Sequence, residues 1–397
     1  VGLNPLIHKL ESPPFFLSTF CIDCNNSLSP AFVGFKSSTH FVFLATLSFM
    51  EDSKNISFSP LQEKALHIAP LWRKNILAWY KDNGRFTLPW RNLQGENAPY
   101  GVYVSEMMLQ QTQVKRVLEC YYQPFMESFP TLLALSYATE EQVLKAWEGL
   151  GYYTRVRNML KTAHICAQKF SHTLPHTYNE LIALPGIGAY SAGAILCFGF
   201  KQNVSFVDGN IRRLLCRIFA LSNPKMVLLE KLAQILLDID SSFDYNQALL
   251  DIGATLCTPK SPSCLICPLQ SLCDGYNAPH LYPLPKQSTL IPLELHLGIC
   301  VHNHHIALVR SSKGLYHGLY NLPLLTSDSL TQTHKCGECR HHYTKYHIRA
   351  YIYHIDFKCF QTLNIFDEIT LIPINELNSK PLSSLCKKAL KIAGLEY

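Results

Sequence analysis

The feature that most constrains this chain is a set of four cysteines within residues 257–273, separated by six, two and five residues. They are Cys257, Cys264, Cys267 and Cys273. Four thiolates this close would repel one another unless a metal offset their charge, and sites with four cysteine ligands hold zinc or an iron–sulfur cluster. Zinc sites usually pair two C-x2-C knuckles, and this set contains one, so the spacing favours an iron–sulfur cluster. Four unrelated buried cysteines are the remaining alternative.

The composition of the whole chain agrees with metal-bound thiols. The 397 residues include 15 cysteines and carry a formal charge of +6. This is not the even cysteine set of a short secreted chain, so a reducing compartment is the stronger interpretation and a disulfide scaffold the weaker one. The charge suits an anionic partner without identifying it. No run approaches the roughly 18 apolar residues of a membrane span, and we expect a bacterial, cytoplasmic protein.

The sequence texture predicts four parts. Residues 1–60 lack periodicity and read as an N-terminal extension that is disordered or not native, with Met50 as a candidate start; a targeting or regulatory tail is the alternative. Residues 61–277 show helical periodicity with frequent proline and glycine, which predicts an all-α domain. Prolines in residues 278–292 predict a linker. Residues 293–397 predict a smaller α+β domain, with strands at 293–301, 304–309 and 346–357 and a helix at 382–393.

A glycine-containing turn lies in the segment Leu184-Pro-Gly-Ile-Gly. Gly186 and Gly188 allow a tight turn, and the N–H groups at the start of the next helix can bind a phosphate oxygen without a side-chain charge. A plain helix connection is the alternative. About twenty residues later comes Val207-Asp208-Gly209-Asn210. Asp208 is a helix N-cap, a carboxylate placed in a groove, or both.

Three further strings complete a pattern. They are L-P-W-R at residues 88–91, V-S-E-M-M-L-Q-Q-T-Q-V at 104–114 and W-E-G-L-G-Y-Y-T-R-V-R-N at 147–158. In this order, with the hairpin and the cysteines, they resemble the endonuclease III superfamily of DNA repair glycosylases, and within it the match is close to adenine glycosylases of the MutY type. The resemblance covers residues 71–273 strongly and 293–397 weakly. It implies a helix-hairpin-helix glycosylase domain with one 4Fe-4S cluster, followed by a MutT-like (Nudix-like) domain.

The resemblance also assigns the chemistry. Glu106 is the expected general acid, because adenine leaves a sugar poorly unless its imidazole ring is protonated, and an acid of tuned pKa can supply that proton. From the residues alone, an ordinary glutamate in the first turn of a helix is the favoured interpretation of Glu106, and the resemblance reverses it. Asp208 is expected to stabilise the positive charge that develops on the sugar, or to attack it, as paired carboxylates do in sugar hydrolysis.

Base excision requires the target nucleotide to leave the base stack. The resemblance implies a wedge, a stacking tyrosine beside the lesion, an amide for the adenine edge and two residues that hold the sugar and the catalytic carboxylate. In that order they are Leu109, Gln110 and Gln111; Tyr152; Gln247; and Asn210 with Tyr190. Leu109 and Tyr152 are alternatively plain core residues.

Tyr190 separates the two leading enzymatic hypotheses. Relatives that also cut the strand place a lysine here and form a Schiff base, which tyrosine cannot form. We therefore expect a monofunctional, monomeric adenine glycosylase acting on duplex DNA with adenine opposite 8-oxoguanine or guanine. An endonuclease III-like glycosylase and lyase for oxidised pyrimidines is the alternative, and a non-catalytic DNA-binding or redox-sensing protein is the third.

The C-terminal part departs from its family in detail. Residues 314–323 resemble the G-L-x-x-x-L-W-E-F-P string of the MutT-like domain, and residues 341–345 resemble the loop that senses 8-oxoguanine. Tyr343 and Thr344 are the candidate lesion contacts, while Lys345 replaces the family's histidine. No magnesium-binding Nudix helix is evident, so nucleotide hydrolysis is not expected. Cys336 and Cys339 form one C-x2-C knuckle, a weak candidate for a second metal.

Overall fold

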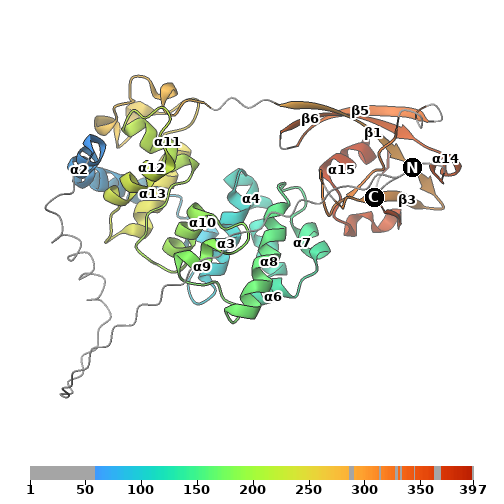
Figure 1. Ribbon diagram of the computed structural model, residues 1–397, viewed down its shortest axis with the longest axis horizontal. Helices are drawn as coiled ribbons and strands as arrows, with labels where there is room; N and C mark the ends of the chain where they lie inside the picture. The colour runs from blue at the N-terminus through green and yellow to red at the C-terminus, as the bar shows by residue number, and fades with distance from the viewer. Residues whose placement is uncertain are drawn as a thin grey trace, which may run out of the picture. The chain divides into compact units, whose positions relative to one another are not determined.

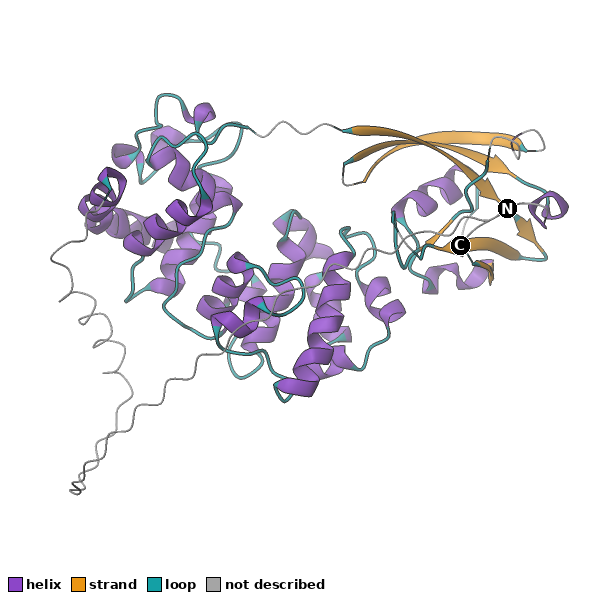
Figure 2. Ribbon diagram, in the orientation of Figure 1, coloured by secondary structure: helices purple, strands orange, loops and turns teal. Residues whose placement is uncertain are grey.

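The computed structural model describes residues 59–285, 290–312, 314–326, 330, 333–343, 345–361 and 368–395. Nearly all of the predicted N-terminal extension and the candidate lesion contact Thr344 lie outside these residues. Among the described residues, the regular elements up to residue 281 are helices and the strands all follow that point (Figure 2). The prediction of an all-α domain followed by a smaller α+β domain is confirmed. The domain boundaries remain predictions.

The helical part begins with α2 (Pro60–Asn83). Trp72, Ile76 and Tyr80 recur every fourth residue, so they share one face of the helix, and each is at most 4% exposed. This buried face packs against α12 and α13. In chain order the other elements are η2 (Pro89–Arg91), α3 (Ala98–Leu109), α4 (Val114–Cys120), α5 (Tyr122–Ser128), α6 (Leu132–Ser136), α7 (Glu140–Ala146), α8 (Thr154–Lys169), α9 (Tyr178–Ile182), α10 (Ala189–Ala194), η3 (Ile195–Gly199), α11 (Gly209–Ile218), α12 (Met226–Leu236), α13 (Ser242–Thr255), η4 (Cys264–Ile266), η5 (Gln270–Leu272) and η6 (Pro279–Leu281).

Helix α3 is the central element of this domain. It is buried along almost its whole length, as its apolar sequence predicts for a helix surrounded by others. The π-helical turn η3 crosses it closely, and a Cβ added at Gly199 would lie 2.7 Å from the Cα of Pro99. The absence of a side chain at Gly199 therefore allows this approach. Glu106 lies near the C-terminal end of α3, so the packing of this helix fixes its position.

The C-terminal domain contains two small sheets (Figure 1). One has the order β1-β6-β5, with β1 parallel to β6 and β6 antiparallel to β5. In the other, β3 pairs with β2, β4 and β7. The elements are β1 (Ile291–Ile299), β2 (Val301–His302), β3 (His305–Arg310), β4 (Tyr320–Asn321), β5 (His334–Tyr343), β6 (Tyr346–His354), α14 (Phe357–Gln361), β7 (Ile369–Pro373), η8 (Ile374–Ser379) and α15 (Ser384–Ile392).

The predicted strands and the last helix are present here, but β5 was missed. Its sequence, H-K-C-G-E-C-R-H-H-Y, is polar at almost every position, so no alternation of apolar and polar residues marks it as a strand. It forms because β6 supplies its backbone partners from Tyr343 back to His334. No helix of the described residues has the length and apolar character needed to cross a membrane.

Candidate active site

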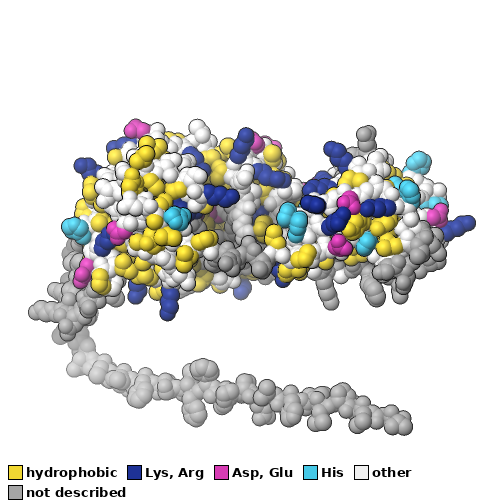
Figure 3. Space-filling model, turned by 90° about the horizontal axis from the view of Figure 1, so that it is seen from above, with side chains coloured by type: hydrophobic (Ala, Val, Ile, Leu, Met, Phe, Trp, Pro, Cys, Tyr) yellow, Lys and Arg dark blue, Asp and Glu magenta, His cyan; other side chains and the backbone are white. Residues whose placement is uncertain are grey.

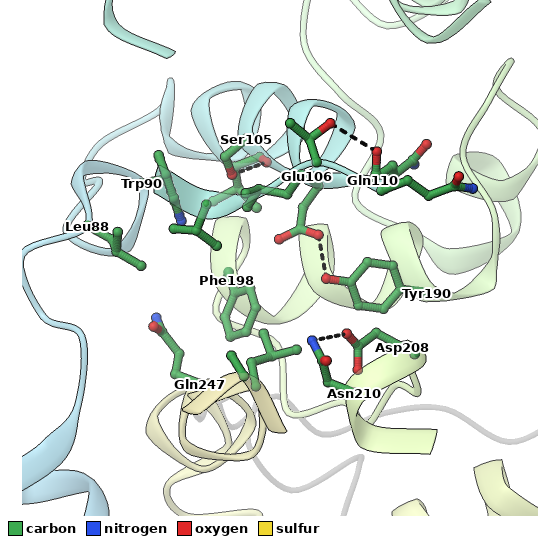
Figure 4. Close-up of a pocket in the computed structure, with 18 of the residues that line it drawn as sticks. Leu88, Trp90, Ser105, Glu106, Gln110, Tyr190, Phe198, Asp208, Asn210 and Gln247 are labelled. Carbon is green, nitrogen blue, oxygen red and sulfur yellow. Dashed lines mark hydrogen bonds between the residues drawn. The ribbon is translucent and has the colours of Figure 1, made fainter. Parts of the chain in front are cut away.

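A cavity of about 720 Å³ opens between α3, η2, α10, the start of α11 and α13. It is lined by the predicted residues Glu106, Leu109, Gln110, Gln111, Tyr190, Asp208, Asn210 and Gln247. In Figure 4 the Glu106 side chain extends from α3 toward the Tyr190 hydroxyl, and Asp208 and Asn210 lie on the other side of Tyr190. Residues that are up to 141 positions apart in the sequence thus surround one cavity, from Glu106 to Gln247.

Glu106 is a buried carboxyl group held by one strong hydrogen bond. Glu106 is only 5% exposed, and its Oε2 accepts a hydrogen bond of 2.6 Å from the Tyr190 hydroxyl. Burial raises the pKa of Glu106 to about 7, an effect that the Asp208 charge adds to and that the Tyr190 bond and Arg91 oppose. Glu106 can therefore carry a proton near neutral pH, as a general acid must.

Asp208 is the N-cap of α11 and also a wall of the cavity. Its Oδ1 accepts a hydrogen bond of 2.6 Å from the Ile211 backbone N–H, and its Oδ2 accepts one of 3.0 Å from Asn210 Nδ2. Burial raises the pKa of Asp208, and the hydrogen bonds to the α11 backbone oppose that rise. The helix-cap interpretation and the groove interpretation therefore both hold in this structure.

The predicted wedge forms the loop that follows α3. Leu109, Gln110 and Gln111 line the cavity, and Gln111 has φ +56°. Arg155 holds this loop and was not singled out from the sequence. Its Nη1 donates to the carbonyl oxygens of Met107, Met108 and Gln110 at 2.7, 2.9 and 2.7 Å. The only sequence signal for Arg155 was its place in the string at residues 147–158, where it was given no role.

Tyr152 and Tyr343 lie outside this cavity. Tyr152 is 40% exposed, has φ +49°, and its ring lies against the Arg155 guanidinium. Tyr343 is half-buried and packs on Tyr316, with 4.4 Å between ring centroids. Burial raises the pKa of Tyr343, and Tyr152 is close enough to add to that shift. Neither of these two predicted lesion contacts therefore lines the cavity that holds Glu106.

The hairpin glycines form a separate backbone site. Gly186 has φ +79°, a conformation that favours glycine, and an added Cβ would lie 2.9 Å from Asn158 Nδ2. Gly188 is the N-cap of α10 and has open space around its Cα. The turn is therefore shaped as predicted, while its binding of phosphate stays a prediction.

Gln247 lies on α13 and is 2% exposed. Its Oε1 accepts a long hydrogen bond of 3.5 Å from the Tyr80 hydroxyl. Behind the cavity wall, Asp251 is fully buried and forms ion pairs with Arg85 and Arg91. The sequence did not reveal these pairs, although Asp251 follows Gln247 by four residues and so lies on the same face of α13.

The four cysteines of residues 257–273 line a second, small cavity. Burial raises the pKa of Cys267 and of Cys273 to about 11, so these thiols need a neighbouring positive charge to ionise. No group of three or more His, Cys, Asp or Glu within the described ranges is placed to hold a single metal ion, the second knuckle at Cys336 and Cys339 included. A cluster of several irons needs more widely spaced thiolates than one ion does. All four thiols line the same small cavity and Arg217 donates a hydrogen bond to one of them, so this set of donors fits a thiolate-bound cluster.

Two arginines connect the cysteine loop to the first cavity. Arg217 Nη1 donates to Cys257 Sγ at 3.3 Å and to the Thr258 carbonyl at 2.8 Å. Arg213 Nε donates to the Cys257 carbonyl at 2.7 Å, and its Nη2 donates to Asn210 Oδ1 at 2.9 Å. Because Asn210 in turn donates to Asp208, the loop and the N-cap of α11 are held by one hydrogen-bond network.

Comparison with known proteins agrees with this geometry. Residues 104–239 match the family described as HhH-GPD superfamily base excision DNA repair protein, and residues 257–273 match the iron-sulfur binding domain of endonuclease III. The adenine DNA glycosylase of Buchnera aphidicola subsp. Baizongia pistaciae is 44% identical over 233 residues, covering 55% of this chain and 65% of that protein. Those of Mus musculus and Homo sapiens are 44% and 41% identical, covering 52% and 51% of this chain and 42% and 39% of theirs.

The match thus spans about two fifths to two thirds of these relatives' length. Among solved structures, a thermostable thymine-DNA glycosylase gives a TM-score of 0.49 at 24% identity, covering 54% of this chain and 97% of that one. A MutT NUDIX hydrolase from Burkholderia pseudomallei gives 0.21 at 13% identity, covering 25% and 97%. The prediction of an iron–sulfur cluster is confirmed, and its ligation by the four cysteines stays a prediction. The chain therefore contains, in residues 104–239, a domain of the HhH-GPD superfamily of base excision DNA repair proteins, followed by an endonuclease III-type iron–sulfur segment in residues 257–273.

Proposed function

We propose that this protein is a monofunctional DNA glycosylase that removes adenine paired with 8-oxoguanine or guanine. The observation that carries the proposal is the pair of Glu106 and Tyr190 in the 720 Å³ cavity. Glu106 has a pKa of about 7 and accepts a hydrogen bond from Tyr190, which stands where a strand-cutting enzyme needs an amine. The relatives named above, which are called adenine DNA glycosylases, support the choice of base.

The first step is the departure of adenine from its sugar. Glu106 donates its proton to an imidazole nitrogen of the flipped base, so that adenine leaves as a neutral molecule. Gln247 in the cavity wall can pair with the adenine edge through its amide. The nearby Asp208 carboxylate stabilises the positive charge that develops on the sugar, and its hydrogen bonds to Ile211 and Asn210 fix it in place before the reaction.

Hydrolysis is the second step, and the strand remains intact. A water adds its oxygen to the sugar carbon, its released proton passes to the now ionised Glu106 carboxylate, and an abasic site remains. Among the described side chains, Tyr190 alone donates a hydrogen bond to the Glu106 carboxylate. Its phenol cannot form a Schiff base with the opened sugar. The protein therefore lacks the amine that would couple base removal to strand cleavage at this position.

Three features are assigned to DNA contacts, and the cluster has a supporting role. The wedge of Leu109, Gln110 and Gln111 fills the space that the flipped base vacates. The backbone N–H groups of the Gly186–Gly188 turn bind a phosphate. Tyr152, Tyr343 and Thr344 contact the 8-oxoguanine side of the pair. The protein acts as a monomer. The iron–sulfur cluster, held by the four cysteines, organises the loop beside α11.

Base release from defined duplexes tests this function. Purified protein should release adenine from an A:8-oxoguanine duplex and leave alkali-labile abasic sites without direct strand breaks. Glu106→Gln should bind the same duplex and release no adenine, because it has no proton to donate. Release of oxidised pyrimidines with strand cleavage would instead support the endonuclease III-like alternative. Duplex binding without any base release would support the non-catalytic one.

A further inference from the structure

Behind the wall of the 720 Å³ cavity lies an ion-pair group that the mechanism above does not use. Asp251 on α13 is fully buried, and its carboxylate accepts four hydrogen bonds. Arg91 donates two from Nη1 and Nη2 at 2.7 and 2.6 Å. Arg85 donates two more, from Nε at 2.6 Å and from its backbone N–H at 2.9 Å. One carboxylate thus fixes two guanidinium groups.

Only two of these three groups face the cavity. Arg85 and Arg91 line the cavity, whereas Asp251 does not. The side chain of Arg91 is 7% exposed, so its charge is screened little by water. Burial alone would raise the pKa of Asp251, but the bonds and charges of Arg91 and then Arg85 outweigh it and lower that pKa. Asp251 is therefore a stable negative charge at neutral pH.

We propose that Asp251 is a positioning residue for the proposed reaction: it fixes Arg91 and Arg85 in the cavity wall and offsets the positive charge that Arg91 would otherwise direct at Glu106. The inference rests on the proposed function, in which Glu106 must hold a proton. Three groups already act on Glu106, namely Tyr190 from α10, Asp208 before α11 and Arg91 from η2. Without Asp251, Arg91 would be uncompensated and would favour the ionised form of Glu106.

The first test neutralises Asp251 without changing its shape. In Asp251→Asn, the alkaline limb of single-turnover adenine release, which reports the loss of the Glu106 proton, should move to lower pH by about 1 unit, the low end for a neighbouring charge. The rate at the acidic end of the profile should be retained. Asp244→Asn makes the same chemical change at an exposed position of the same helix and should leave the profile unchanged.

The second test restores the charge balance. Asp251→Asn combined with Arg91→Gln removes both charges and should return the alkaline limb close to its wild-type position. Asp251→Glu keeps the charge and should leave the limb in place. A residue that only supports the fold would not show this reversal. An unmoved limb in Asp251→Asn, or a limb that stays shifted in the double variant, would overturn the inference.

Two measurements keep the outcome clear if Asp251→Asn folds poorly. Arg91→Gln alone removes the positive charge and should move the limb to higher pH; a downward or absent shift counts against the inference. Difference infrared spectroscopy of the protonated carboxyl band, assigned with Glu106→Gln, follows the ionisation of Glu106 without any turnover. If the wild-type protein releases no base at any pH, the proposed function fails, while the infrared titration still decides the role of Asp251.

Discussion

At the scale of single residues, Glu106 shows that the fold tolerates an unfavourable group in the cavity. Its pKa in the folded protein is about 7, above the usual 4.5, because the side chain is buried. A folded state that holds the proton more tightly than the unfolded chain is stabilised at acidic pH. That contribution is lost as pH rises from about 4.5 to about 7.

Glu106→Gln should therefore be more stable than the wild type at pH 8, by on the order of 3 kcal/mol from a shift of this size, while losing base release. The advantage should shrink toward pH 5, where Glu106 is protonated in the folded state. Urea unfolding at the two pH values measures it, with Glu230→Gln, an exposed glutamate on α12, as the control. Equal stability of Glu106→Gln and the wild type at pH 8 would contradict the prediction.

At the scale of elements, α11 begins at a residue with two tasks. Asp208→Asn keeps an acceptor for the Ile211 N–H but has no carboxylate, so it should unfold at nearly the wild-type denaturant concentration and show no turnover. Asp208→Ala removes the cap as well and should lose about 1 kcal/mol of unfolding free energy in addition. Denaturant unfolding beside single-turnover assays separates the two tasks. Full activity of Asp208→Asn would remove Asp208 from the mechanism.

The crossing of α3 and η3 gives a second prediction at this scale. A Cβ at Gly199 would lie 2.7 Å from the Cα of Pro99, which is backbone and cannot swing aside. Gly199→Ala should therefore destabilise the protein by about 1–3 kcal/mol through overpacking. Gly188→Ala, where nothing lies within 4 Å of the new methyl group, is the matched control and should leave stability nearly unchanged. Thermal unfolding of both variants is sufficient, and equal midpoints would refute the close-packing argument.

The sequence predicted the elements and the residues of the cavity better than the connections behind them. Strings with distinctive residues led to Glu106, Tyr190 and Asp208, and the family resemblance added Gln247; the structure places all four around one cavity. The partners of Asp251 and the loop contacts of Arg155 depend on which helices become neighbours, and local spacing does not carry that information. Strand β5 was missed for the same reason, since its partner β6, and not its own pattern, makes it a strand.

At the scale of the whole molecule, the iron–sulfur segment and the cavity are parts of one hydrogen-bonded structure. Cys267→Ser should lower the iron and acid-labile sulfide content and the thermal unfolding midpoint. It should also slow base release, because Arg213 and Arg217 of α11 bind the cysteine loop and the start of α11 lines the cavity. Cys120→Ser, at an exposed free cysteine, is the control. Zinc without iron in the purified protein would contradict the assignment of a cluster.

The charged side chains on the surface also matter at the scale of the whole molecule. Figure 3 shows lysine and arginine side chains spread over the face drawn, with histidines among them over the C-terminal domain. On β5 and β6, Arg340 lies opposite Arg349 and His342 opposite His347. Such a surface suits a polyanion, and affinity for duplex DNA is expected to fall steeply as salt rises.

The double task of Asp208 has a consequence for how such a position can change over evolutionary time. Because the side chain both starts α11 and faces the cavity, a lineage that abandons catalysis is still obliged to keep a residue that can begin a helix. Asparagine, serine or threonine at this position would therefore be the mark of a descendant that retains the architecture and has given up the reaction. An alanine or a leucine would instead mark one in which the local fold itself has been rebuilt.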